Sequence, residues 1–131
     1  MAILAPISAG ELIDKITILR VKATRIGDPA KEANVRVELA LLEATAAREL
    51  AGSPDLERLT AELTQINAAL WDIEDGKRDH ERRQDFGPSF VQLARRVYID
   101  NDRRAAVKRA INALVGSEIV EEKSYKPYLG G

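Results

Sequence analysis

Cysteine is absent from this chain of 131 residues. A disulfide framework and a zinc site built from thiolates are therefore excluded, and a catalytic Cys-His pair cannot form. A chain without cysteine fits a reducing compartment, so the expected location is the cytoplasm. Histidine is almost as scarce, because His80 stands alone in a charge-rich run without a G-x-S-x-G motif. A Ser-His-Asp triad is therefore not expected.

Long apolar runs and glycine-rich loops are also missing. The short apolar stretch from Met1 to Pro6 has no basic region before it, and no later stretch is long enough to span a bilayer. We therefore expect neither a signal peptide nor a membrane partner. No glycine pattern matches a phosphate loop or a dinucleotide fingerprint, so no cofactor is expected. With 45% hydrophobic and 31% charged residues, the chain is expected to form one soluble domain over residues 1–131.

Helical periodicity is present from the beginning of the chain. Ser8 and Glu11 form an S-x-x-E capping box, which predicts a helix that begins at Ser8 and ends near Gly27. Apolar residues then recur at intervals of three and four, as they do along one face of a helix. They are Leu12, Ile16, Leu19, Ala23 and Ile26.

Two proline-containing signals predict the next two helices. Asp28-Pro29 and Ser53-Pro54 each place a capping side chain directly before a proline in the first turn. The second helix has the apolar stripe Val35, Leu39, Leu42, Ala46 and Leu50, and the third has Leu56, Leu59, Leu63, Ile66, Leu70 and Ile73. Because only a short break separates these helices, we expect them to pack as an antiparallel pair.

The third stripe continues with polar residues at Lys77, His80 and Gln84. This favours a projecting, frayed helix end over a polar end that faces another surface. Phe86-Gly87-Pro88-Ser89 then breaks the chain.

Residues from Pro88 to Val115 form either one helix or two. A continuous helix would pair Asp100 with Arg104, whereas a broken one would use Asp100 or Asn101 as a cap. The polar residues in this stretch favour a break or a kink. The sequence as a whole predicts an all-α fold, an antiparallel bundle of four to five helices with an extended tail (117–131) packed on it. The residues expected to hold the tail are Ile119, Val120, Tyr125 and Tyr128.

Charge is distributed unevenly along the chain. Residues 76–112 contain ten Lys or Arg against five Asp or Glu, although the net charge of the whole chain is −1. Basic helix faces commonly serve solubility alone, and the alternative is a surface that attracts anions.

One polar surface lies on the third predicted helix, where Trp71, Glu74 and Arg78 share a face. A half-buried tryptophan beside exposed ion pairs, including Glu74 with Arg78, is the simpler interpretation. The alternative is one wall of a polar site or a protein interface. The nearby acidic residues are more often solvated than bound to a cation, so no metal is expected.

A second polar surface follows in the basic segment. Guanidinium groups bind carboxylate or phosphate through paired hydrogen bonds, so a small anion is the natural ligand for such a surface. The candidate residues are Arg95, Tyr98, Asn101, Arg104, Lys108 and Asn112.

Five segments resemble an uncharacterised bacterial family, a domain of unknown function. They are PISAGELIDKITILRVKATRI, NVRVELALLEA, LWDIEDGKRDHE, LARRVYIDNDRRAAVKRAIN and GSEIVEEKSYKPY, which together cover most of the chain. The resemblance implies no activity. It draws attention to the polar residues inside these segments, namely Asp14, Lys15, Arg20, Trp71, Glu74, Asp75, Tyr98, Asn101, Asp102, Arg104, Lys108, Arg109 and Asn112.

The opening ELIDKI also resembles the first helix of the small helical chorismate mutases. Those enzymes need cations placed around a dianion and require neither a nucleophile nor a metal. Arg20, Lys22 and Arg36 could contribute such charges here, but the register after the first helix departs from that pattern.

The functional hypothesis is a helical interaction module that self-associates as a homo-oligomer and binds a protein partner or a small anionic ligand. A metal-free enzyme acting on a small anionic metabolite is the first alternative, although the missing catalytic signatures argue against an enzyme. Weak nucleic-acid binding is the second alternative, and it is not favoured because the chain is slightly acidic overall.

Overall fold

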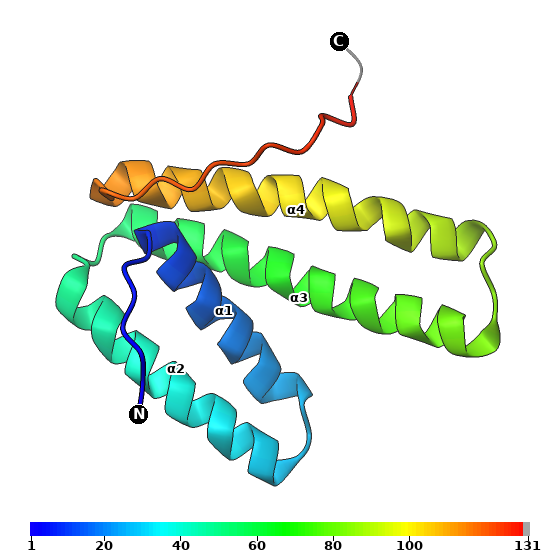
Figure 1. Cartoon of the computed structure of the whole chain (residues 1–131), viewed down its shortest axis with the longest axis horizontal. Helices are drawn as coiled ribbons and strands as arrows, with labels where there is room; N and C mark the ends of the chain where they lie inside the picture. The colour runs from blue at the N-terminus through cyan, green and yellow to red at the C-terminus, as the bar shows by residue number, and fades with distance from the viewer. Residues whose placement is uncertain (130–131) are drawn as a thin grey trace.

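The computed structural model describes residues 1–129, and the last two residues of the predicted tail lie outside the described residues. Four helices follow one another: α1 (Ala9–Arg25), α2 (Pro29–Glu49), α3 (Pro54–Arg83) and α4 (Pro88–Val115) (Figure 1). Residues 1–129 contain no strand. The predicted all-α fold is confirmed.

The starts of the first three helices are fixed by local side-chain caps. Ser8 Oγ accepts a hydrogen bond from the backbone N–H of Glu11 at 3.1 Å, and Ser53 Oγ accepts one from Leu56 at 3.1 Å. Asp28 caps α2 by accepting the backbone N–H groups of the first turn. Each cap satisfies donors that have no partner within the helix, so the predicted starts are confirmed.

The helices form two antiparallel hairpins, α1 with α2 and α3 with α4 (Figure 1). Helix α1 also packs against both α3 and α4, whereas in residues 1–129 the backbones of α2 and α3 make no close contact. The predicted α2–α3 pair is therefore wrong. The short connection fixes only the adjoining ends of the two helices, and the apolar faces of both turn towards α1.

The core lies where α1 meets α3 and α4. Its buried members are Leu12, Ile13, Ile16, Leu56, Leu59, Leu63, Ile66, Val107 and Ile111. Because α1 has a neighbour on several sides, it also buries residues outside its predicted stripe, including Asp14, Thr17 and Val21. The buried surface of α1 is therefore wider than the single apolar stripe predicted from the sequence.

Helix α4 runs without interruption from Pro88 to Val115, so the predicted break near Asp100 is wrong. Asp100 is buried inside the helix, and its carboxylate oxygens lie 3.5 Å from Arg96 and 3.6 Å from Arg103. Arg104 instead turns towards α1. Packing along α3 supports the polar stretch of α4, and this tertiary contact outweighs the local signal for a break.

The far end of the α3–α4 hairpin is packed rather than frayed. His80 is buried, its ring lies 5.9 Å from the ring of Phe90, and its Nδ1 is 3.0 Å from the carbonyl oxygen of Asp85. Gln84 ends α3 in the left-handed conformation with φ 54°. His80 therefore faces α4 while Gln84 stays exposed, and the predicted fraying of this helix end is wrong.

The tail has no regular secondary structure and runs along α4 (Figure 1). The predicted apolar anchors Ile119, Val120 and Tyr125 are exposed. Polar contacts hold the tail instead, together with Tyr128, whose ring centre lies 5.4 Å from that of Tyr98. Among the described residues, none of the helices combines the length and apolar character needed to cross a membrane.

Candidate functional site

A fully buried carboxylate, Asp14, lies at the junction of three helices. Its Oδ1 accepts a hydrogen bond from Arg104 Nε of α4 at 2.9 Å and another from Asn67 Nδ2 of α3 at 3.0 Å. Arg104 Nη2 donates a second bond, to Oδ2. Two parallel bonds from one guanidinium to one carboxylate give the strongest protein ion-pair geometry.

Burial of this charge is tolerated because the surrounding groups satisfy it. An unpaired carboxylate in the protein interior costs several kcal/mol, and an ion pair of good geometry with further hydrogen bonds offsets this cost. Thr17 extends the network, since its Oγ1 accepts from Asn67 at 2.9 Å and donates to the carbonyl oxygen of Asp14 at 2.8 Å. The hydrogen bond to Asp14 raises the pKa of Arg104, which keeps the guanidinium charged.

Lys108 lies one turn further along α4 and contacts carboxylates from two parts of the chain. Its Nζ is 2.7 Å from Glu11 of α1 and 2.8 Å from Glu121 of the tail. Burial alone would lower the pKa of Lys108, but the hydrogen bonds to Glu11 and Glu121 raise it. Burial would likewise raise the pKa of Glu11, and the contact with Lys108 outweighs burial and lowers it.

Asn112 closes the network at the start of α1. Its Oδ1 accepts the backbone N–H of Gly10 at 2.7 Å, one of the first-turn donors that α1 itself cannot satisfy. The backbones approach closely here, because a Cβ at Gly10 would lie 2.5 Å from the carbonyl oxygen of Lys108. Asn112 therefore joins α1 to α4 through its Oδ1.

Next to this network, a cleft of about 820 Å³ lies between α4 and the tail. All three tyrosines of the chain line it, together with Asn101 and Arg104. The full lining is Val97, Tyr98, Asn101, Asp102, Arg104, Ala105, Glu121, Glu122, Lys123, Ser124, Tyr125, Lys126 and Tyr128. A smaller cavity adjoins it, and Lys108, Arg109 and Asn112 lie in its wall.

The model of a family of unknown function, DUF6165, matches residues 3–130. The chain belongs to the DUF6165 family. No curated protein and no solved structure matches it. The site of this DUF6165 chain must therefore be interpreted from its own residues.

The DUF6165 structure brings together most of the second predicted surface. Tyr98, Asn101 and Arg104 line the cleft, and Lys108 and Asn112 line the adjoining cavity. Arg95 is exposed and lies outside the lining of both.

The first predicted surface does not join the cleft. Trp71, Glu74 and Arg78 line neither of these cavities, and Arg78 is exposed. Glu74 pairs with Lys77 at 3.3 Å in place of the expected Arg78. Trp71 is half-buried, as the simpler interpretation expected.

The sequence drew attention to Asp14 only through the family resemblance, and it did not identify Glu11 or Asn67 as partners in this DUF6165 site. Asp14 and Glu11 neutralise Arg104 and Lys108, and Asn67 supplies the third hydrogen-bonding side chain. One signal was available: Asp14 interrupts the apolar run of α1 between Ile13 and Ile16. Charged residues within such a run are rarely buried unless they are paired.

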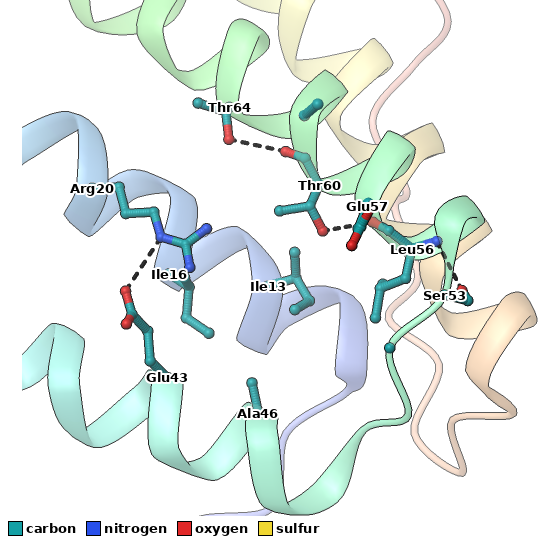
Figure 2. Close-up of a pocket in the computed structure, with 12 residues that line it drawn as sticks. Ile13, Ile16, Arg20, Glu43, Ala46, Ser53, Leu56, Glu57, Thr60 and Thr64 are labelled. Atoms are coloured by element: carbon teal, nitrogen blue, oxygen red, sulfur yellow. Dashed lines mark hydrogen bonds and ion pairs between the residues drawn. The ribbon is translucent and has the colours of Figure 1, made fainter.

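A second hollow lies between the diverging helices α2 and α3, where residues of α1 also line it (Figure 2). Its volume is about 410 Å³. Ile13, Ile16 and Leu56 form its apolar floor, and Arg20 pairs with Glu43 at 3.3 Å at its edge. The groove exists because α2 and α3 do not pack against each other.

Proposed function

We propose that this chain is a binding module whose ligand is a small molecule carrying a carboxylate or a phosphate, held in the cleft between α4 and the tail. The contact between Lys108 and Glu121, at 2.8 Å, is the observation that carries this proposal. Glu121 belongs to the tail, so a carboxylate from outside the helical bundle already lies on a cation of the bundle. A ligand's anionic group would take the same position.

The charge balance supports this exchange. Within the helices, Asp14 and Glu11 match Arg104 and Lys108. A ligand that displaces Glu121 would replace one anion with another, so no buried charge would lose its partner. The site can therefore accept an anion although its cations are already paired.

The rest of the cleft favours a ligand larger than a simple ion. Its volume of about 820 Å³ lies within the range of small-molecule pockets, about 300–1,000 Å³. Tyr98, Tyr125 and Tyr128 provide planar apolar surface with hydroxyl groups at the edge, and Asn101 provides an amide. An anionic molecule with a ring or another flat part would use all of these groups.

We propose binding rather than catalysis. Electrostatic catalysis of the chorismate-mutase type requires cations placed to stabilise charge that develops on the substrate. Arg104 and Lys108 are already neutralised by carboxylates of α1. Nucleic-acid binding is also less favoured, because Arg96 and Arg103 pair with Asp100 along the same helix.

The proposal is tested by calorimetric titration of the full chain with citrate, pyrophosphate and a nucleoside monophosphate. A ligand at 100 times its Kd should stabilise the fold by about 2.7 kcal/mol. We expect Glu121→Gln to bind the ligand more tightly, because it removes the internal competitor. Tyr98→Ala and Asn101→Ala should weaken binding, because both side chains line the cleft.

Arg95→Ala is the matched control, since Arg95 is a cation of the same helix that lies outside the cleft. It should leave the affinity unchanged. Absence of heat and of thermal stabilisation with every compound would contradict the proposal. So would equal affinities for the wild type, Glu121→Gln and Tyr98→Ala.

A helical protein partner is the second candidate, and the groove of Figure 2 favours it. An amphipathic helix could place apolar residues over Ile13, Ile16 and Leu56. A photo-crosslinking amino acid at Ala61, in the groove wall, should then capture one partner in cells. The same group at Ala113, exposed on α4, is the control. Equal capture from both positions would contradict this candidate.

We further propose a bacterial source and a cytoplasmic location. The resemblance of the five sequence segments supports the first, and the lack of cysteine supports the second. Fractionation of cells that produce the chain from its own gene would test the location.

A further inference from the structure

The outer face of α2 is apolar although no other part of the bundle covers it. Val37 is 64% exposed and Leu41 is 59% exposed. Both lie on the side of α2 that points away from α1. Within residues 1–129, the only helix that packs closely against α2 is α1.

Helix α2 is therefore apolar on two opposite sides. Its inner side carries Val35, Leu39 and Leu42, which lie against α1 and the core. Its outer side carries Val37 and Leu41, one cation, Arg48, and a row of exposed alanines: Ala30, Ala33, Ala40, Ala44 and Ala47. An exposed apolar patch of this kind commonly marks a surface that contacts another molecule. The outer face thus has the composition of an interface.

We propose that this face is covered by the same face of a second copy, in an antiparallel α2–α2 contact with two-fold symmetry. Residues 30, 33, 37, 40, 44 and 47 follow one another at intervals of three and four, as in the contact line of two packed helices. Alanine lets two backbones approach closely, while Val37 and Leu41 fill the space beside them. Two-fold symmetry requires a face that matches itself.

Opposite charges on one edge of the face fit the antiparallel arrangement. Arg36 and Glu43 lie on the same edge of the face, two helical turns apart. An antiparallel contact places Arg36 of each copy beside Glu43 of the other, so the dimer gains two opposite-charge pairs. A parallel contact would instead bring Glu43 beside Arg48 and Arg36 beside Leu41, so only the antiparallel contact uses the charge of Arg36.

The ion pairs that Arg36 and Glu43 form within one copy are compatible with ion pairs between two copies. Arg36 contacts Glu32 at 2.8 Å, and Glu43 contacts Arg20 at 3.3 Å. All four side chains are at least one-third exposed. Exposed pairs of this kind contribute little to stability, so Arg36 and Glu43 can share their partners at the interface.

Sedimentation equilibrium of the full chain tests the interface. The wild type should be a dimer that dissociates on dilution. The double variant Val37→Glu/Leu41→Glu should dissociate at a concentration about 100-fold higher or more, because it places carboxylates against carboxylates in the contact. Val91→Glu is the control, since Val91 is a similarly apolar residue of α4 that is 48% exposed. Circular dichroism should show the same helix content for both variants.

A mixing experiment tests the orientation of the helices. Arg36→Glu alone creates two repulsive carboxylate pairs in an antiparallel dimer, and Glu43→Arg alone creates two repulsive cation pairs. Both single variants should therefore form weaker dimers than the wild type. Mixed in equal amounts at low salt, they should form a heterodimer, because each copy then offers the charge that the other lacks.

A wild type that stays monomeric at the highest attainable concentration would overturn the proposed interface. So would a Val37→Glu/Leu41→Glu variant that dimerises as tightly as the wild type. Homodimers of Arg36→Glu and Glu43→Arg that do not exchange on mixing would overturn the antiparallel contact. These outcomes are separate from ligand binding, because the cleft lies along α4 and a monomer could still bind an anion.

Discussion

At the scale of single residues, Asp14 connects three helices. Its side chain is buried, and α1, α3 and α4 all contribute to its hydrogen bonds. A carboxylate in this position cannot be solvated, and the ion pair with Arg104 takes the place of water. The reverse also holds, because the Arg104 side chain is only 29% exposed. Removing either charge leaves the other without a partner in a region of low dielectric constant.

We predict that Asp14→Asn lowers the free energy of unfolding by about 3 kcal/mol, since it keeps the size of the side chain and strands the Arg104 charge. Urea denaturation followed by circular dichroism measures this change. Asp72→Asn is the matched control, because Asp72 pairs with Arg25 at the surface and is 66% exposed. It should cost less than about 1 kcal/mol. Equal losses in the two variants would show that the Asp14 charge is not important for stability.

Glu11 should make the stability depend on pH. Its pKa is lowered from the ordinary value of 4.5 in the folded state. The folded state therefore binds the proton less readily than the unfolded state, and this contribution to stability is complete above the unfolded pKa. It disappears as the pH falls through the lower, folded pKa.

The measurement is the difference in unfolding free energy between the wild type and Glu11→Gln. We expect this difference to favour the wild type at neutral pH, to shrink as the pH falls below about 4.5 and to vanish below the folded pKa of Glu11, where both side chains are uncharged. A difference that stays constant down to acidic pH would argue against the ion pair of Glu11 with Lys108.

At the scale of elements, α1 is the central helix, and its start lies unusually close to α4. At Gly10 the two backbones approach so closely that no β-carbon fits. The polar groups then meet directly, with Asn112 accepting the Gly10 N–H and Lys108 reaching Glu11. The glycine therefore positions the whole network.

Gly10→Ala should destabilise the protein by about 1–3 kcal/mol, because the added methyl group meets backbone that cannot move away easily. The sign of this change in stability is informative, since alanine in a helix normally stabilises a protein relative to glycine by about 0.5–1 kcal/mol. Gly52→Ala is the control, because no atom lies within 4 Å of its β-carbon position. Thermal denaturation of both variants would decide the matter, and a stabilised Gly10→Ala would contradict the close approach.

At the scale of the whole molecule, α1 connects α2 to the α3–α4 hairpin. Within residues 1–129, the backbone of α2 makes no close contact with α3 or α4. The core cluster contains residues of α1, α3 and α4, and α2 is attached through α1. Separate unfolding of the α3–α4 hairpin would expose this shared core. We therefore predict one cooperative transition for the chain.

The single tryptophan, Trp71, reports on α3, while circular dichroism reports on all four helices. The two signals should give the same midpoint in urea, as expected for a two-state transition. A tryptophan transition that is clearly displaced from the helical one would show that the hairpins unfold independently. In that case the chain would not behave as one domain.

Local chemistry made the helices predictable from the sequence. Ser8, Asp28 and Ser53 cap backbone donors within three residues of themselves, so their effect requires no knowledge of the rest of the chain. The intervals between apolar residues identify the buried side of each helix for the same reason. Tyr98, Asn101 and Arg104 share one face of α4, and their proximity followed from helical spacing alone.

Only the tertiary structure decided which faces meet. It placed α2 and α3 apart, although a short connection joins them, because both helices bury their apolar sides against α1. It kept α4 continuous through Asp100, and it turned Arg104 away from that residue towards Asp14, which lies 90 residues earlier. Contacts over such separations depend on the summed burial of whole helix faces. The sequence therefore determined the elements, and packing determined their partners.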